Sequence, residues 1–330
     1  MNILIRLPNW LGDMVMSSAF VRAVKEEYPY AVIDLVAKMG IDSLLDRFPP
    51  PKERFIFSKD EFKGLAGAWK FGKQIAKQKK YDLFFCLPDS FSSALMGFAS
   101  GAKKRVGYRK ETRGWLLTSS FSKRKNLHRV EEYLDLLQRF TGKTLPEPDV
   151  SLVTRGNTNR RSVIININSE AASRRLPEEK AVKIIDAVRE RIPNEIILVG
   201  SKKEKEIVDS VYQKLKNKQN LFNRAGDTGL GELMDLFESA AVLLTTDSGP
   251  AHLANAMGTH TIVLFGAGNE NETAPYNKAN RSVIRLGQLS CEPCVSNTCK
   301  KYGVPECLLQ LDEALIVKEM QDALNRLTSA

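Results

Sequence analysis

The sequence predicts an α/β protein of two domains, each built on a parallel sheet with crossover helices. Short apolar runs alternate with segments of helical periodicity, a polar stretch divides them into two series, and 330 residues suffice for two cores. The strand-like runs cover residues 2–7, 32–36, 81–87, 163–167, 195–199, 241–246, 261–265 and 283–286. Helical periodicity covers residues 14–28, 178–191 and 202–215. We expect the two sheets to face each other across a central cleft.

The polar stretch TGKTLPEPDVSLVTRGNTNRRS, residues 141–162, has the proline and glycine content of an interdomain linker. We therefore predict an N-terminal domain over residues 1–155 and a C-terminal domain over residues 156–310. The amphipathic segment 312–327 lies beyond the second series of strands. We expect residues 311–330 to form a helix that packs back on the N-terminal domain.

Charge is concentrated in one segment of the first domain. Residues 103–129 contain ten Lys or Arg and one acidic residue, Glu111, whereas the whole chain has a net charge of +10. Such a run of charge is explained by a solvated surface loop. It is also explained by a binding site for nucleic acid, for an anionic membrane, or for a phosphorylated or carboxylated acceptor. No nucleic-acid motif surrounds the segment, so we expect no nucleic-acid partner.

The N-terminal stretch MNILIRLPNWLGDMVMSSAF contains Arg6 and Asp13, and no apolar run has the length of a membrane span. We expect a cytoplasmic protein without a targeting segment, with reduced cysteines. Four thiols cluster late in the chain, at Cys291, Cys294, Cys299 and Cys307. They could hold a structural zinc ion, but their spacing differs from the common zinc motifs, so reduced packing cysteines are the favoured interpretation and no metal is expected.

Two strand-to-helix joints carry the candidate chemistry, because the carboxyl edge of a parallel sheet is where ligands bind. In the second domain, Asp247 or Ser248 can cap a helix, Gly249 lets a ligand approach, and Pro250 suits the first turn. This joint predicts either a phosphate site at the helix N-terminus or a simple cap. In the first domain, Asp13 follows Gly12 after the first strand, as a helix cap or a general base.

Several motifs together resemble the ADP-heptose:lipopolysaccharide heptosyltransferases of glycosyltransferase family 9. They are LPNWLGDMVMSSAFVRAVKEEYP, TTDSGPAHLANAMG and the late Cys-Glu-Pro-Cys, Cys and Cys-Leu pattern, and all three are similar to the heptosyltransferase II subgroup. The resemblance covers nearly the full chain. It implies the GT-B fold, in which two Rossmann-like domains bind acceptor on the N-terminal side and nucleotide sugar on the C-terminal side.

The resemblance also implies site residues. Asp13 matches the base that deprotonates the acceptor hydroxyl. Arg174 stands where members of the family place a phosphate-binding Lys. Glu204 matches the acidic residue that holds the ribose hydroxyls, and Thr228 matches a residue whose backbone contacts adenine. Leu176 replaces a usual Trp. The donor-binding candidates are Gly12, Ser169, Arg174, Glu204, Thr228, Asp247, Ser248, Gly249 and His252. No cofactor beyond the ADP-heptose substrate is implied.

The acceptor that the resemblance implies is the anionic inner core of lipopolysaccharide, which could bind the basic segment. The resemblance therefore also implies that the protein lies peripherally on the inner face of the inner membrane. The acceptor-binding candidates are Lys103, Lys104, Arg105, Arg109, Lys110, Arg113, Lys123, Arg124, Lys125 and His128. We expect an inverting heptosyltransferase that acts as a monomer on the inner-core heptose. The alternatives are first-heptose transfer to Kdo-lipid A, another GT-B nucleotide-sugar enzyme, or a non-catalytic anion-binding protein.

Overall fold

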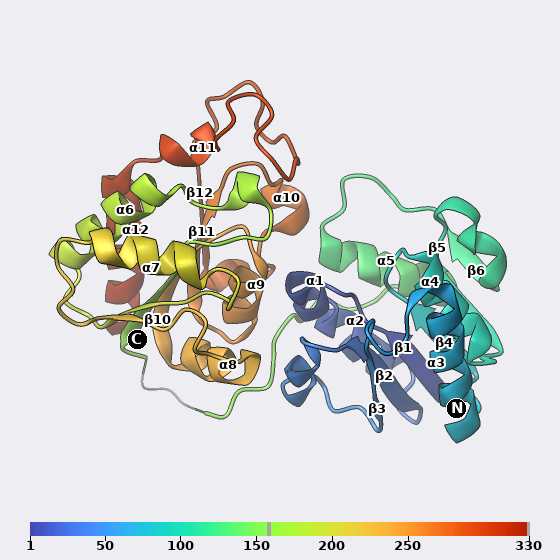
Figure 1. Ribbon diagram of the computed structural model, residues 1–330. Coiled ribbons are helices and arrows are strands. Elements are labelled where there is room, and N and C mark those ends of the chain that lie inside the picture. The colour runs from blue at the N-terminus through green and yellow to red at the C-terminus, as the bar shows by residue number, and fades with distance from the viewer. Residues whose placement is uncertain (157–159, 329–330) are drawn as a thin grey trace. The chain divides into compact units, whose positions relative to one another are not determined.

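The computed structural model describes residues 1–156 and 160–328. The chain divides into two compact units, Met1–Val153 and Thr154–Ala330, so the division falls two residues before the expected boundary. In Figure 1 the first unit runs from blue to green and the second from light green to red. Residues 157–159 of the expected linker lie outside the described residues.

The first unit is a six-stranded parallel sheet. Its strands are β1 (Asn2–Arg6), β2 (Val32–Lys38), β3 (Arg54–Phe57), β4 (Leu83–Cys86), β5 (Lys104–Tyr108) and β6 (Ser119–Phe121). Their order is β3-β2-β1-β4-β5-β6, which places β1 at the centre with Arg6 opposite Val36 and Cys86. This is the Rossmann order, whose strand order reverses between β1 and β4 and opens a crevice at their carboxyl ends.

The helices of the first unit connect these parallel strands. They are α1 (Leu11–Met16), α2 (Ser18–Glu27), α3 (Gly64–Gln78), α4 (Phe91–Ala99) and α5 (Arg129–Thr141), with the short 3-10 helices η1 (Asp42–Asp46) and η2 (Glu111–Leu116). The single helix expected over residues 14–28 is divided at Ser17, whose N–H and hydroxyl both bond the carbonyl oxygen of Met14. This division leaves α1 as a short helix that presents its first turn at the end of β1.

The second unit repeats the same topology. Its strands are β7 (Ser162–Asn166), β8 (Ile196–Leu198), β9 (Leu221–Asn223), β10 (Ala240–Thr246), β11 (His260–Phe265) and β12 (Arg281–Arg285), in the order β12-β11-β10-β7-β8-β9. Its helices are α6 (Glu178–Arg191), α7 (Lys205–Lys214), α8 (Leu230–Ser239), α9 (Gly249–Ala256), α10 (Glu270–Thr273), α11 (Glu306–Leu309) and α12 (Glu313–Thr328), with η3 (Ala172–Arg174) and η4 (Lys278–Asn280). Two α/β units with parallel sheets confirm the predicted fold class.

Continuous apolar strands explain why helices cover the sheets. All seven residues of β10 are buried, as are all five of β7, so both faces of these central strands must be covered. The strands that the sequence analysis missed are β3, β5, β6 and β9, which lie toward the sheet edges. In β5 only Val106, Gly107 and Tyr108 are buried, and the charged start of the strand hid it within the basic segment.

Helix α12 packs on its own unit, and the expectation that it returns to the N-terminal domain is wrong. Its apolar face, with Ile316, Val317 and Met320, belongs to the same buried cluster as β10 and β11. An ion pair of 2.6 Å between Lys180 of α6 and Glu313 fixes the start of the helix. The helical spacing of these apolar residues therefore finds its partner surface within the second unit. Among the described residues, no helix has the length and hydropathy needed to cross a membrane.

Candidate active site

A pocket of about 230 Å³ lies in the first unit at the carboxyl ends of β1 and β4. Its wall is made by the segment after β1, the segment after β4, and the start of α5. The lining residues are Pro8, Asn9, Trp10, Asp13, Leu87, Pro88, Asp89, Ser90, Lys123, Arg129, Glu132 and Tyr133. The pocket thus lies where the strand order of this sheet reverses, as ligand sites of open α/β sheets do.

Asp13 is the carboxylate that the first strand delivers to this pocket. It lies in the first turn of α1 and makes no side-chain capping bond, so the helix-cap interpretation of Asp13 is not supported by the contacts of α1. Burial raises the pKa of Asp13, while Arg129 opposes that shift through an ion pair of 3.5 Å to Oδ1. A carboxylate with a raised pKa in a pocket has the properties of a general base.

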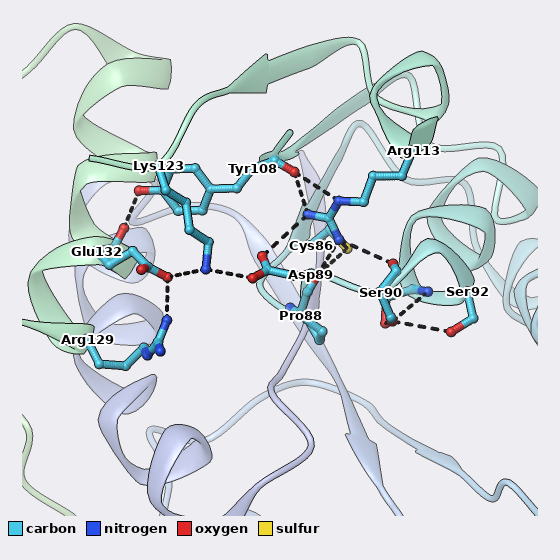
Figure 2. Close-up of polar contacts among 11 residues, drawn as sticks. Cys86, Pro88, Asp89, Ser90, Ser92, Tyr108, Arg113, Lys123, Arg129 and Glu132 are labelled. Carbon is cyan, nitrogen blue, oxygen red and sulfur yellow. Dashed lines mark hydrogen bonds and ion pairs between the residues drawn. The ribbon is translucent and has the colours of Figure 1, made fainter. Parts of the chain in front are cut away.

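A chain of alternating charges lines the pocket beside Asp13. Lys123 Nζ lies 2.6 Å from Asp89 Oδ2 and 2.7 Å from Glu132 Oε1, and Arg129 Nη1 lies 2.8 Å from the same Glu132 oxygen. Figure 2 shows Lys123 between the two carboxylates. Arg129 joins this chain to Asp13, so three carboxylates and two cations line the pocket.

The buried guanidinium of Arg113 fixes the segment that follows β4. Its Nη1 donates to the carbonyl oxygens of Pro88 (2.5 Å) and Ser90 (3.2 Å), and its Nε and Nη2 donate to the carbonyl oxygen of Tyr108 at 2.9 and 2.7 Å (Figure 2). Arg113 is 1% exposed. The expectation that it belongs to an exposed acceptor surface is therefore wrong, because its donors are bonded within the fold.

Other members of the basic segment divide into two groups. His128 is buried and caps α5, its Nδ1 accepting from the N–H of Val130 at 3.2 Å, so this ring nitrogen serves the fold, and the expected contact of His128 with acceptor anions stays a prediction. Lys103 pairs with Asp82 at 2.8 Å, Arg124 pairs with Asp135 at 3.3 Å, and Arg105 donates to the carbonyl oxygens of Ala102 and Leu116. The side chains of Lys104, Arg109, Lys110 and Lys125 lie exposed.

In the second unit, β10 ends at the joint that the sequence singled out. Asp247 is buried, and its Oδ2 lies 3.2 Å from Nη1 of Arg174, while Ser169 Oγ donates to the carbonyl oxygen of Asp247 at 3.0 Å. Burial raises the pKa of Asp247, and Arg174 opposes that shift. The structure therefore brings three of the donor candidates together after β7 and β10.

The capping role expected for this joint is wrong. Ser248 is the N-cap of α9 by position, but its side chain makes no capping bond, because its hydroxyl donates back to the carbonyl oxygen of Thr246 at 3.0 Å. Asp247 is turned to Arg174 instead. Pro250 lies in the first turn of α9 as predicted, and His252 is buried on that helix.

Glycine at position 268 is required by this arrangement, and the sequence analysis missed it. A Cβ atom on Gly268 would lie 2.0 Å from Oδ2 of Asp247. Only a residue without a side chain lets the segment after β11 pass the Asp247 carboxylate this closely. The signal was available, since Gly268 follows the predicted strand 261–265 at the same sheet edge.

Glu204 and Thr228 lie in two neighbouring loops of the second unit. Gly226 N–H donates to the carbonyl oxygen of Gly200 at 2.9 Å, which joins the loop after β8 to the loop after β9. Oε2 of Glu204 accepts from the N–H of Ser201 at 2.7 Å, so this carboxylate also orders its own loop. Both side chains are partly exposed.

The four late cysteines are free thiols. In residues 1–156 and 160–328, no group of three or more His, Cys, Asp or Glu is arranged to hold a metal ion. Cys307 is buried, which raises the pKa of its thiol to about 11, whereas Cys294 is exposed.

Asp89, Arg129 and Glu132 also line the pocket and were not predicted from the sequence. Asp89 follows the predicted strand 81–87, so the rule that singled out Asp13 applied to it as well. Arg129 and Glu132 lie in the first turn of a helix that was not predicted, and nothing in the local sequence indicates that Arg129 reaches Asp13.

Comparison with known proteins decides the family. The sequence profile of glycosyltransferase family 9 (heptosyltransferase) matches residues 68–304, more than half of the chain. The chain belongs to glycosyltransferase family 9. This family member is a glycosyltransferase, which confirms the predicted enzyme class.

Relatives of this family 9 enzyme include lipopolysaccharide heptosyltransferase 2 of Escherichia coli K12, 29% identical over 319 residues that cover 87% of this chain and 88% of that protein. Lipooligosaccharide heptosyltransferase 2 of Campylobacter jejuni is 25% identical over 333 residues, which cover 97% of this chain and 98% of that protein. The solved structure of E. coli ADP-heptose lps heptosyltransferase II matches with a TM-score of 0.82 and 25% identity over 99% of both chains. These matches confirm the resemblance and the fold that the motifs predicted.

Proposed function

We propose that this enzyme transfers heptose from ADP-heptose to the inner-core heptose of lipopolysaccharide, with inversion at the transferred carbon. The placement of Asp13 in the pocket at the end of β1 carries the proposal, since a general base must reach the attacking hydroxyl. The heptosyltransferase 2 relatives support the choice of donor and acceptor.

In the proposed reaction the acceptor hydroxyl occupies the pocket and attacks C1 of the heptose. The new C1–O bond forms as the bond to the ADP oxygen breaks, and the hydroxyl proton passes to the Asp13 carboxylate. ADP leaves with the bonding electron pair. Lys123 and Arg129 offer cations to acceptor anions, while Asp89 and Glu132 can accept from sugar hydroxyls.

The donor is proposed to bind the second unit. Arg174 would place its charge on the diphosphate beside the α9 joint, where Gly249 and Ser248 open the first turn. Glu204 would accept from the ribose hydroxyls, and Thr228 would contact adenine. Negative charge that develops on the leaving diphosphate would then be stabilised by Arg174 and by backbone N–H groups.

The exposed cations of residues 103–129 support a peripheral position at an anionic membrane. We also propose that the enzyme acts as a monomer on the inner face of the inner membrane. Lys104, Arg109, Lys110 and Lys125 are the exposed members that remain available for acceptor carboxylates or phosphates.

ADP release from ADP-heptose tests the proposal. Acceptors with one heptose should support turnover, and Kdo-lipid A without heptose should not. Turnover only with the second acceptor would assign first-heptose transfer instead. ADP should raise the thermal unfolding temperature and UDP should not. Stabilisation by UDP alone would indicate another nucleotide-sugar enzyme. If neither nucleotide stabilises the protein, a non-catalytic anion-binding protein would be indicated.

A further inference from the structure

Four aromatic rings form a connected surface on α3, α4 and η2. The ring centroids of Trp69 and Phe98 are 6.1 Å apart, those of Phe98 and Trp115 are 6.3 Å apart, and those of Phe91 and Trp115 are 6.2 Å apart. We call Trp69, Phe91, Phe98 and Trp115, together with Leu65, the aromatic face. Figure 1 shows α3 and α4 side by side, in agreement with their extensive packing.

The aromatic face is exposed although its residues are among the most apolar in the chain. Trp115 is 66% exposed, Leu65 52%, and Trp69 and Phe98 39% each. Leu65 and Trp69 are one turn apart on α3, so they share one side of that helix. A connected apolar surface of this kind on a folded protein marks a site of contact with a partner or a membrane.

Cations lie directly on this face. Lys73 Nζ lies 5.1 Å from the centroid of Trp69, and the Arg105 guanidinium carbon lies 5.2 Å from the centroid of Phe98. Residues 63–80 contain no acidic residue and six lysines, of which Lys79 pairs with the buried Asp34 at 2.6 Å, and α4 carries no charge. Lys70 and Lys73 are both exposed. The face therefore combines exposed aromatic rings with an excess of positive charge.

Tryptophan beside lysine and arginine is typical of a protein surface at the interface of an anionic lipid bilayer. Aromatic rings of this kind gather at the headgroup level of bilayers, and each nearby cation is attracted by anionic lipids. We propose that the aromatic face docks this protein on an anionic lipid bilayer. Charge complementarity selects this occupant, because a protein partner would have to supply a compensating acidic surface.

The aromatic face is also tied to the pocket. Ser90 lines the pocket and caps α4, and Phe91 of the aromatic face is the next residue. Arg113 lies in η2 with Trp115 and donates to the carbonyl oxygens of Pro88 and Ser90, so it joins the Trp115 segment to the pocket wall. Docking of this face would hold the pocket at the bilayer surface. That consequence rests on the proposed function, whereas the docking itself does not.

Vesicle sedimentation tests the docking with the full chain and without any acceptor. Vesicles of phosphatidylcholine with phosphatidylglycerol should bind the protein, and vesicles of phosphatidylcholine alone should bind it at least about tenfold more weakly. The Lys70→Gln/Lys73→Gln variant and the Trp69→Ser/Trp115→Ser variant should each lose at least about tenfold in affinity for the anionic vesicles. The controls Lys216→Gln/Lys318→Gln and Tyr30→Ser/Tyr302→Ser change exposed residues elsewhere and should bind like the wild type.

A second measurement does not depend on the folding of the serine variants. The chain has three tryptophans, and Trp10 lies in the pocket wall rather than on the aromatic face. Brominated anionic lipids should quench the fluorescence of the wild type. In Trp69→Phe/Trp115→Phe, which keeps aromatic side chains, binding should remain within about threefold while most of the quenching is lost.

Several outcomes would overturn the proposal. They are absence of binding to anionic vesicles, wild-type binding by a folded Trp69→Ser/Trp115→Ser variant, and undiminished quenching in the phenylalanine variant. Self-association that these serine substitutions abolish, without vesicle binding, would assign the face to a second copy of the chain. Failure of ADP release with vesicle binding intact would refute the proposed function and leave the docking in place.

Discussion

The Nε atom of Arg129 lies 3.5 Å from Oδ1 of Asp13, and the same guanidinium donates to Glu132 at 2.8 Å. Arg129 therefore connects the carboxylate at the end of β1 to the charged wall that α5 supplies. Its positive charge favours the ionised form of Asp13, against the burial that raises the pKa of this group. The balance between these two effects sets the pH range in which Asp13 can accept a proton.

Arg129→Gln should shift the acidic limb of the pH profile of kcat/KM for the acceptor to higher pH by about one unit. The sign follows from the charge: loss of the cation raises the pKa of Asp13, so the carboxylate is protonated at a higher pH and activity is lost there. Arg124→Gln serves as the control, since Arg124 pairs with Asp135 and does not line the pocket. If the acidic limb of the Arg129→Gln profile stays at the wild-type pH, Arg129 does not influence the pKa of the base that titrates there.

Arg174→Ala and Glu204→Ala should each weaken the binding of ADP-heptose at least about tenfold, as expected when one charge-assisted contact is lost. Titration calorimetry with ADP measures the effect. Arg155→Ala removes an exposed arginine of the same unit that pairs with Asp235, and it should bind ADP like the wild type. Unchanged affinity in both site variants would show that the nucleotide binds elsewhere.

The sequence predicted the positions of the two strand-to-helix joints better than the residues that their side chains contact. Asp13 and Asp247 follow central strands, so the carboxyl-edge rule found both. The bond of Asp247 to Arg174 joins residues that are 73 positions apart, so it depends on how distant segments pack, which no local pattern records. The buried position of Arg113 was missed for the same reason, because composition alone places a cation on the surface.

The exposed cations of the basic segment are expected to act on the acceptor and not on the donor. Neutralising Lys104, Arg109, Lys110 and Lys125 with Gln should raise the KM for the acceptor and reduce its dependence on salt. The KM for ADP-heptose should not change, because the donor is proposed to bind the other unit. Equal loss for both substrates would mean that these cations support the fold.

Gly268→Ala should disturb the Asp247 carboxylate. The added methyl would lie 2.0 Å from Oδ2 of Asp247, so the carboxylate must leave its place beside Arg174. We expect the free energy of unfolding to fall by about 1–3 kcal/mol and the stabilisation by ADP to decrease. Gly231→Ala is the matched control, since a Cβ at Gly231 in α8 would meet nothing within 4 Å. A Gly268→Ala enzyme with wild-type stability and ADP response would contradict the close packing.

Asp13→Asn is the direct test of the proposed base. The amide keeps the size of the side chain but cannot accept the hydroxyl proton, so kcat should fall by about 10²–10⁴-fold. The affinity for ADP-heptose should change little, because the donor candidates Arg174, Asp247 and Glu204 lie in the second unit.

Asp89→Asn makes the comparison sharp, because Asp89 is a second carboxylate of the same pocket. It pairs with Lys123 at 2.6 Å, so its loss should raise the acceptor KM and lower kcat by less than about tenfold, below the range expected for a general base. A value of kcat within about threefold of wild type in Asp13→Asn, together with a larger loss in Asp89→Asn, would move the proton transfer from Asp13 to Asp89.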